Sequence, residues 1–288
     1  MQSTRKSVQC LSPTGLHTMS YKEWGNANNP KVLVCVHGLA RVSDDFDVLA
    51  ASLCEEYRVV CPDVVGRGSS GHLRNPMHYQ IPQYVSDMVT LLARLEVDTV
   101  DWFGTSMGGL IGMGIASLEG NPIRKLLLND VGPALNPVAL SRIGEYVGQA
   151  VAFERFDEAL AYIKSISQPF GAHTDAQWEK LARDVLRKND TGQWIKHYDL
   201  GLCQPFKATT PEQVVAGEAM LWAAYDAIKS KTLVVRGADS DLLSSETATE
   251  MTRRGPCASL VQIPHVGHAP TFVSAEQIAI ARDFFLND

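Results

Sequence analysis

The sequence predicts an α/β fold: an eight-stranded, mostly parallel sheet with helices on both faces and an inserted helical cap. Three observations predict it. Short, β-branched apolar runs alternate with amphipathic helical patterns, which is typical of a doubly wound sheet. Most of these runs are apolar throughout, as strands covered on both faces are. One long stretch between two of the strands shows only helical patterns.

The strands are predicted in chain order. Residues 8–11 and 18–24, with Gly15 between them, predict an antiparallel hairpin at one edge of the sheet. The remaining strands are expected at residues 31–36, 57–61, 99–103, 125–129, 232–235 and 259–263. In a sheet of this kind, functional sites lie beyond the carboxyl ends of the strands. The residues that follow each strand are therefore the first candidates for chemistry.

Helices are predicted between these strands at residues 44–53, 81–95, 106–118, 245–252 and 275–285. Within residues 81–95, apolar side chains recur every three or four positions and form one stripe for a sheet face. Four further helical patterns, at residues 139–150, 156–166, 176–186 and 212–227, fall between two strands, in a stretch too long for a loop. We therefore predict a core of residues 1–132 and 229–288 and a helical cap of residues 133–228.

Composition excludes several classes of protein. The chain has 288 residues, of which 45% are hydrophobic, so a disordered chain is excluded. Its net charge of −6 disfavours a nucleic-acid binder. No apolar run is long enough to span a bilayer, the amino terminus has no secretory h-region, and the six cysteines contain no C-x2-C pair. We expect a cytoplasmic protein with a small-molecule substrate, no metal or cofactor, and no nucleic-acid or membrane partner; no oligomeric state is predicted.

The strongest motif is G-T-S-M-G at residues 104–108, between a predicted strand and a glycine-rich helix. A turn this tight needs small residues on both sides, and it projects the hydroxyl of its central residue, Ser106, above the sheet. A serine in this position needs a base and a pocket for a developing negative charge. The motif therefore predicts a nucleophilic serine.

The pocket is predicted after the strand at residues 31–36, where His37-Gly38-Leu39 follows. We expect the ring of His37 to bond loop backbone, while the backbone N–H groups of Leu39 and Met107 form an oxyanion hole. The base is predicted in the loop after the last strand, where His268 follows Gly267. His265 is its competitor, but it lies closer to the strand.

The acid that orients the histidine is expected after the strand at residues 232–235. Two carboxylates follow that strand, Asp239 and Asp241, and one is sufficient. Both give the chain order Ser, Asp, His.

These motifs together resemble the α/β-hydrolase superfamily, in particular its capped bacterial serine hydrolases. The resemblance extends from residue 21 to residue 286 and includes P-D-V-V-G-R-G-S at residues 62–69 and L-N-D-V-G-P at residues 128–133. In relatives with a Gly-x-x-Ser-Asp stretch, the final aspartate is the triad acid, which implies Asp241 and leaves Asp239 as a capping residue. Asp130 is a more distant contender, because some members take their acid from the preceding strand. Arg67 matches a sharp structural turn of the superfamily.

The resemblance implies a serine esterase and leaves rivals open. Ser106 at the turn excludes the aspartate-dependent epoxide hydrolases and dehalogenases. Carbon–carbon bond hydrolases usually carry His-Gly-x-Gly-Pro-Gly where this chain has H-G-L-A-R at residues 37–41, which disfavours them. A lactonase, a perhydrolase and a ligand-binding scaffold of the same fold remain alternatives.

Three further residues are candidates for substrate binding. Arg41 would clamp a substrate carboxylate or pair locally with Asp44, Asp45 or Asp63. Tyr146 and Trp222, in the cap, would line an acyl pocket, although such aromatic residues also serve as the core of a cap. We predict cleavage of small-to-medium carboxylic esters through an acyl-enzyme.

Overall fold

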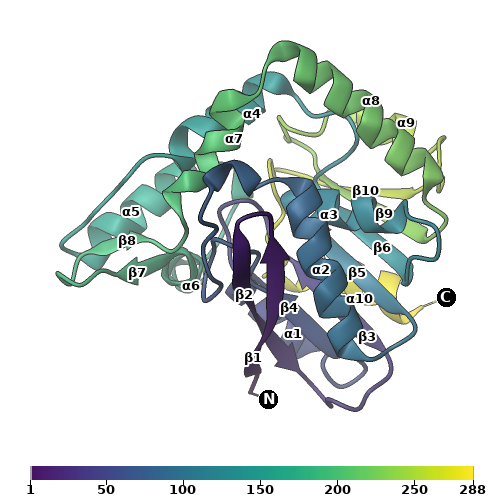
Figure 1. Cartoon of the computed structure of the whole chain (residues 1–288), viewed down its shortest axis with the longest axis horizontal. Helices are drawn as coiled ribbons and strands as arrows, with labels where there is room; N and C mark the ends of the chain where they lie inside the picture. The colour runs from purple at the N-terminus through teal and green to yellow at the C-terminus, as the bar shows by residue number, and fades with distance from the viewer. Residues whose placement is uncertain (1, 288) are drawn as a thin grey trace.

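The computed structural model describes residues 2–287, without the side chain of Pro211. Eight strands form one sheet in the order β1-β2-β4-β3-β5-β6-β9-β10 (Figure 1). Their bounds are β1 Thr4–Ser12, β2 Gly15–Trp24, β3 Val32–Val36, β4 Arg58–Pro62, β5 Val100–Thr105, β6 Ile123–Asn129, β9 Lys231–Gly237 and β10 Ser259–Ile263. Strands β1 and β2 form an antiparallel hairpin, β2 pairs antiparallel with β4, and the other pairs are parallel. The predicted sheet is confirmed.

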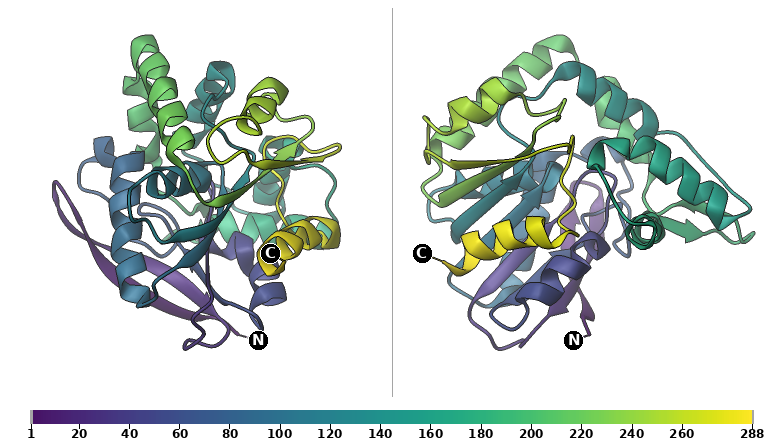
Figure 2. Two further views of the ribbon diagram at one scale, coloured as in Figure 1. Left: turned by 90° about the vertical axis from the view of Figure 1, so that its right-hand side faces the viewer. Right: turned by 180° about the vertical axis from the view of Figure 1, so that it is seen from behind.

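Each face of the sheet carries its own hydrophobic core. On one face, α2 (Ile81–Leu95) and α3 (Met107–Ala116) cover the sheet with side chains such as Met88 and Ile111. On the other, α1 (Asp47–Leu53) and α10 (Ala275–Leu286) bury Leu49 and Phe285. The rear view of Figure 2 shows these two helices in front of the sheet. A further helix, α9 (Ser245–Met251), contributes to the first core.

The chain between β6 and β9 is an insertion that corresponds to the predicted cap. It contains α4 (Pro137–Val147), α5 (Phe156–Ile166), α6 (Asp175–Val185), α7 (Gln204–Ala208) and α8 (Pro211–Ala227). Figure 1 shows α5 and α6 to the left of the sheet, whereas α8 runs back over its upper right. Helix α8 packs against α3, and its residue Tyr225 is fully buried. The insertion therefore has an outer part and a helix that joins the core.

The cap also contains a hairpin that the helical patterns did not predict. Strand β7 (Leu186–Lys188) pairs antiparallel with β8 (Trp194–Lys196), and the predicted helix at residues 176–186 ends one residue earlier. A turn stabilised by the Asn189 side chain joins the two strands. The ring of Trp194 packs 5.0 Å from that of Phe156 on α5. Contact with α5, rather than local propensity, stabilises this short hairpin.

No helix within residues 2–287 combines the length and the apolar character needed to cross a membrane.

Candidate active site

Ser106 stands at the turn between β5 and α3. Its backbone has φ 50° and ψ −114°, a strained conformation for a residue with a side chain. A Cβ at Gly104 would lie 2.3 Å from the Gly108 carbonyl oxygen, and one at Gly108 would lie 2.0 Å from the Val36 carbonyl oxygen. Only glycine fits at either position, so the predicted tight turn around Ser106 is confirmed.

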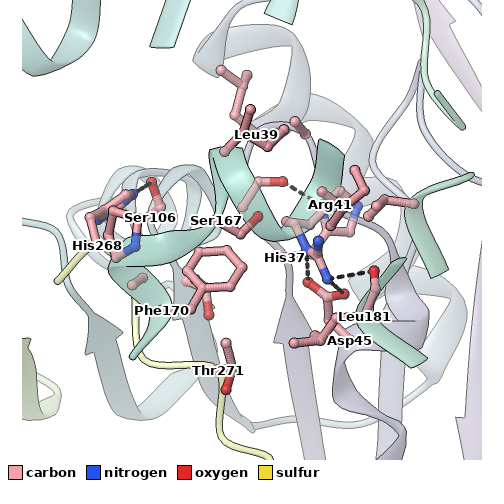
Figure 3. Close-up of a pocket in the computed structure, with 18 of the residues that line it drawn as sticks. His37, Leu39, Arg41, Asp45, Ser106, Ser167, Phe170, Leu181, His268 and Thr271 are labelled. Atoms are coloured by element: carbon pink, nitrogen blue, oxygen red, sulfur yellow. Dashed lines mark hydrogen bonds and ion pairs between the residues drawn. The ribbon is translucent and has the colours of Figure 1, made fainter. Parts of the chain in front are cut away.

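The Ser106 hydroxyl meets His268. Oγ of Ser106 lies 3.0 Å from Nε2 of His268, which lies in the loop after β10. Figure 3 shows the two side chains pointing toward each other. The competing residue, His265, is exposed and does not line the cavity in front of the serine. The structure therefore brings the predicted histidine to the serine.

The acid that contacts His268 is Asp130, so the prediction that Asp241 makes this contact is wrong. Oδ2 of Asp130 lies 2.7 Å from Nδ1 of His268, and the Asp130 side chain is fully buried. The side chain of Asp241 is 40% exposed and pairs with Arg142 of the cap. Asp239, the other alternative in that loop, is exposed.

The loop after β9 supplies a hydroxyl to the site instead of a carboxylate. Strands β6 and β9 are parallel neighbours, so the residues after them lie at the same place on the sheet edge. Oδ2 of Asp130 accepts a hydrogen bond of 2.6 Å from the Ser240 hydroxyl, and Oδ1 accepts one of 2.9 Å from the Gly237 N–H. The sequence signal for Asp130 was its place directly after a buried strand. The neighbouring strand is also followed by aspartates, Asp239 and Asp241, so spacing along the chain did not identify the acid.

The buried ring of His37 holds the predicted oxyanion loop through hydrogen bonds to backbone. His37 is buried: its Nε2 accepts the Val64 N–H at 3.0 Å, and its Nδ1 lies 2.7 Å from the Gly38 carbonyl oxygen. Burial lowers the pKa of His37 to about 4, so the ring is neutral and bonds loop backbone as predicted. Leu39 lines the cavity, and Met107 is the first residue of α3, where the backbone N–H precedes the first helical acceptor. Their N–H groups remain the predicted oxyanion donors.

One buried guanidinium links the two segments that carry these N–H groups. Arg67 donates from Nε to the Leu39 carbonyl oxygen at 2.9 Å, and its Nη2 lies 3.3 Å from Sδ of Met107. It also donates to the Val65 carbonyl oxygen at 2.7 Å and to the Tyr84 hydroxyl at 3.0 Å. The arginine of the predicted turn thus holds the oxyanion loop and the start of α3 together.

A cavity of about 480 Å³ opens in front of Ser106 and His268. Its core wall includes Leu39 and Phe103, and its cap wall combines apolar side chains, such as Ile143 and Ile163, with polar and charged ones. Tyr146 lines the cavity, and its contact with the substrate stays a prediction.

Arg41 also lines the cavity but is already paired. Its Nε and Nη2 lie 2.7 Å and 2.6 Å from the two carboxylate oxygens of Asp45 (Figure 3). Its guanidinium lies 5.7 Å from the centroid of the Phe170 ring. Of the two predicted alternatives for Arg41, the structure therefore shows local pairing with Asp45 and not a guanidinium free to bind a substrate carboxylate.

The prediction that Trp222 lines the pocket is wrong. Its indole lies 4.1 Å below the Arg254 guanidinium and 5.9 Å from the Tyr225 ring, and it does not line the cavity. The reason is that α8, which carries Trp222, packs against α3 instead of over the serine.

The sequence reasoning missed two cations of the cap, Arg142 and Lys196, which line the cavity. Lys196 gave no signal because the short strand that carries it was not predicted.

One group of side chains in the described residues could bring metal ligands together: Cys10, His17 and Asp87. Nε2 of His17 lies 3.0 Å from Oδ2 of Asp87 beneath the β1–β2 hairpin. Burial, with the charge of Asp87, raises the pKa of Cys10 to about 12, so this sulfur stays protonated. None of the three residues lines the cavity, and the group takes no part in the site.

Comparison with known proteins identifies the family of this chain. The model of the alpha/beta hydrolase family matches residues 33–281. A 3-hydroxybutyrate-oligomer hydrolase from Cupriavidus necator is 58% identical over 281 residues, which cover 96% of each chain. Esterase YbfF from Escherichia coli is 24% identical over 91% of this chain and 96% of its own. The crystal structure of an alpha/beta hydrolase from Novosphingobium aromaticivorans, 33% identical, has a TM-score of 0.86 and covers 99% of both chains. The chain belongs to the alpha/beta hydrolase family and is an ester-acting hydrolase.

Proposed function

We propose that this chain hydrolyses the ester bonds of short 3-hydroxybutyrate oligomers with a triad of Ser106, His268 and Asp130. The hydrogen-bonded series from Ser106 through His268 to Asp130, at a cavity of about 480 Å³, carries the proposal. The substrate class is taken from the relative that is 58% identical over nearly the whole chain.

The directions of the hydrogen bonds in the triad determine which nitrogen of His268 accepts the serine proton. Ionised Asp130 can only accept, so Nδ1–H of His268 donates to it, and Nε2 is left to accept the Ser106 proton. As the Ser106 oxygen bonds to the ester carbonyl carbon, that proton moves to His268. The carbonyl oxygen becomes an oxyanion, which the Leu39 and Met107 N–H groups stabilise.

The second half of the reaction uses the same residues. The protonated His268 gives its proton to the leaving alkoxide, and the ester bond breaks to leave an acyl group on Ser106. Water then attacks the acyl-enzyme with His268 as base, which frees the second product and restores the serine. The Ser240 and Gly237 hydrogen bonds hold the Asp130 carboxylate in the orientation that His268 needs.

The cap provides the wall that the chain of the substrate contacts. We propose that residues 133–228 enclose a methyl-substituted ester chain, because apolar side chains such as Ile143, Ile163 and Leu181 form part of the cap wall. A volume of about 480 Å³ suits a short oligomer rather than a bulk polymer surface.

The test is hydrolysis of the 3-hydroxybutyrate dimer and trimer, followed by chromatographic detection of free 3-hydroxybutyrate. Replacing Ser106 by Ala should lower kcat by about 10⁴-fold or more. Ser86→Ala, at an exposed position on α2, is the matched control and should behave as wild type. Wild-type protein that cleaves simple p-nitrophenyl esters but neither oligomer would overturn the substrate; cleavage that survives Ser106→Ala would overturn the triad.

A further inference from the structure

Three lysine and arginine side chains line the cavity, and each has different partners. Arg41 is paired in a bidentate contact with Asp45. Arg142 pairs with Asp241 at the rim, where its side chain is 54% exposed. The third is Lys196, at the end of β8, and no carboxylate of the described chain forms an ion pair with it.

Lys196 is enclosed by the cap. Only 6% of the residue is exposed. Its Nζ donates to the Tyr146 carbonyl oxygen at 2.6 Å and lies 5.7 Å and 5.6 Å from the ring centroids of Tyr162 and Tyr198. An ammonium group has three N–H donors, and the contacts in the described chain give one of them an oxygen acceptor.

An arrangement of this kind is costly for a protein alone. Taking a charge from water into a buried site without a counter-ion is unfavourable, and this burial lowers the pKa of Lys196 to about 8. Lys196 nevertheless remains mostly protonated near pH 7. The neighbouring tyrosines supply ring faces but no negative charge, because burial raises the pKa of Tyr146, Tyr162 and Tyr198. The wall of the substrate cavity therefore offers a cation whose anion is missing.

We propose that Lys196 binds the free carboxylate of the substrate, so that the enzyme selects short hydroxyacyl esters that end in a carboxylate. This inference rests on the proposed function, which it deepens. A 3-hydroxybutyrate oligomer carries one carboxylate, on the alcohol side of its last ester bond. Pairing that group with Lys196 fixes which ester bond lies at Ser106, and the enzyme then cleaves at a set distance from the carboxyl end.

The experiment compares two substrates with the same single ester bond: the 3-hydroxybutyrate dimer as free acid and its primary amide. The measured quantity is the ratio of kcat/KM for the acid to kcat/KM for the amide. Lys196→Met should lower this ratio by about 10- to 100-fold, mainly through a higher KM for the acid. Lys196→Arg should recover part of the ratio, and Lys188→Met, at an exposed position of the same hairpin, should leave it as in wild type.

The outcomes separate the two proposals. An equal fall of kcat/KM on both substrates would make Lys196 a structural residue and overturn the carboxylate site. If wild-type protein cleaves neither substrate in a Ser106-dependent manner, the proposed function fails instead.

A second measurement needs no variant and covers the case in which Lys196→Met does not fold. With p-nitrophenyl acetate as reporter, 3-hydroxybutyrate should inhibit wild-type protein at a concentration at least about tenfold lower than 3-hydroxybutyramide does. Equal inhibition by the acid and the amide would overturn the carboxylate site.

Discussion

The charged groups on the core side of the cavity and those on its cap wall differ in how fully they are hydrogen-bonded. Behind the core wall, where neither residue lines the cavity, Asp130 accepts three hydrogen bonds, and Arg67 donates to two carbonyl oxygens and one hydroxyl. On the cap side, Lys196 has one oxygen acceptor, and the Arg142–Asp241 pair is open to water. A charged group whose hydrogen-bonding capacity is filled by the protein is held in one orientation, whereas a group with unfilled capacity can bind a ligand. We therefore expect the core side to supply the chemistry and the cap wall to supply the selectivity.

The largest expected effect separates the two candidate carboxylates. Asp130→Asn removes the acceptor that fixes the His268 tautomer and should lower kcat by about 10⁴-fold. Asp241→Asn loses only an exposed ion pair, which is worth about 0–1 kcal/mol, and should change kcat by less than about threefold. Steady-state kinetics on a p-nitrophenyl ester measures both. Similar losses in the two variants would contradict the assignment of Asp130.

The next effect is on stability and concerns Arg67. Arg67→Met would leave the carbonyl oxygens of Leu39 and Val65 without their donor inside the core, and we expect a loss of about 3–5 kcal/mol in the free energy of unfolding. Arg67→Lys should lose less, because it keeps the charge but not the fork of donors. Urea denaturation measures the change, with the exposed Arg187→Met on β7 as control. A loss under about 1 kcal/mol would mean that the core wall does not depend on this residue.

The smallest expected effect has the opposite sign. Lys196→Met removes an uncompensated buried cation and should stabilise the free protein by about 1–2 kcal/mol at pH 7, even though the Tyr146 carbonyl oxygen loses a donor.

The pH dependence of this gain follows from the pKa of Lys196, which falls from 10.5 to about 8 on folding. Between these values the unfolded chain binds more protons than the folded one, so wild-type stability rises with pH. The advantage of Lys196→Met should therefore be full below about pH 8 and disappear by about pH 10.5. The tyrosines around Lys196 do not titrate first, because burial raises their pKa. Urea denaturation at several pH values tests this, and a gain independent of pH would contradict the account.

Much of the site was predictable because it depends on local pattern. The G-T-S-M-G turn at residues 104–108 is recognisable from sequence because two of its positions must be glycine. Only glycine at positions 104 and 108 tolerates the close approach of the Gly108 and Val36 carbonyl oxygens. His268 follows a strand whose end must meet the same edge of the sheet. The eight strands were found for the same reason, because strands covered on both faces are continuous apolar runs.

What the sequence determined by itself is therefore the sheet, the serine turn and the histidine, each encoded within a few neighbouring residues. Only the tertiary structure decided between Asp130 and Asp241, because both follow neighbouring parallel strands, and the Gly237 and Ser240 hydrogen bonds orient just one of them toward His268. It also decided that Trp222 lies on the core and that Lys196 faces the cavity. Those two outcomes depend on how α8 and the β7–β8 hairpin pack against distant segments, and no local pattern carries that information.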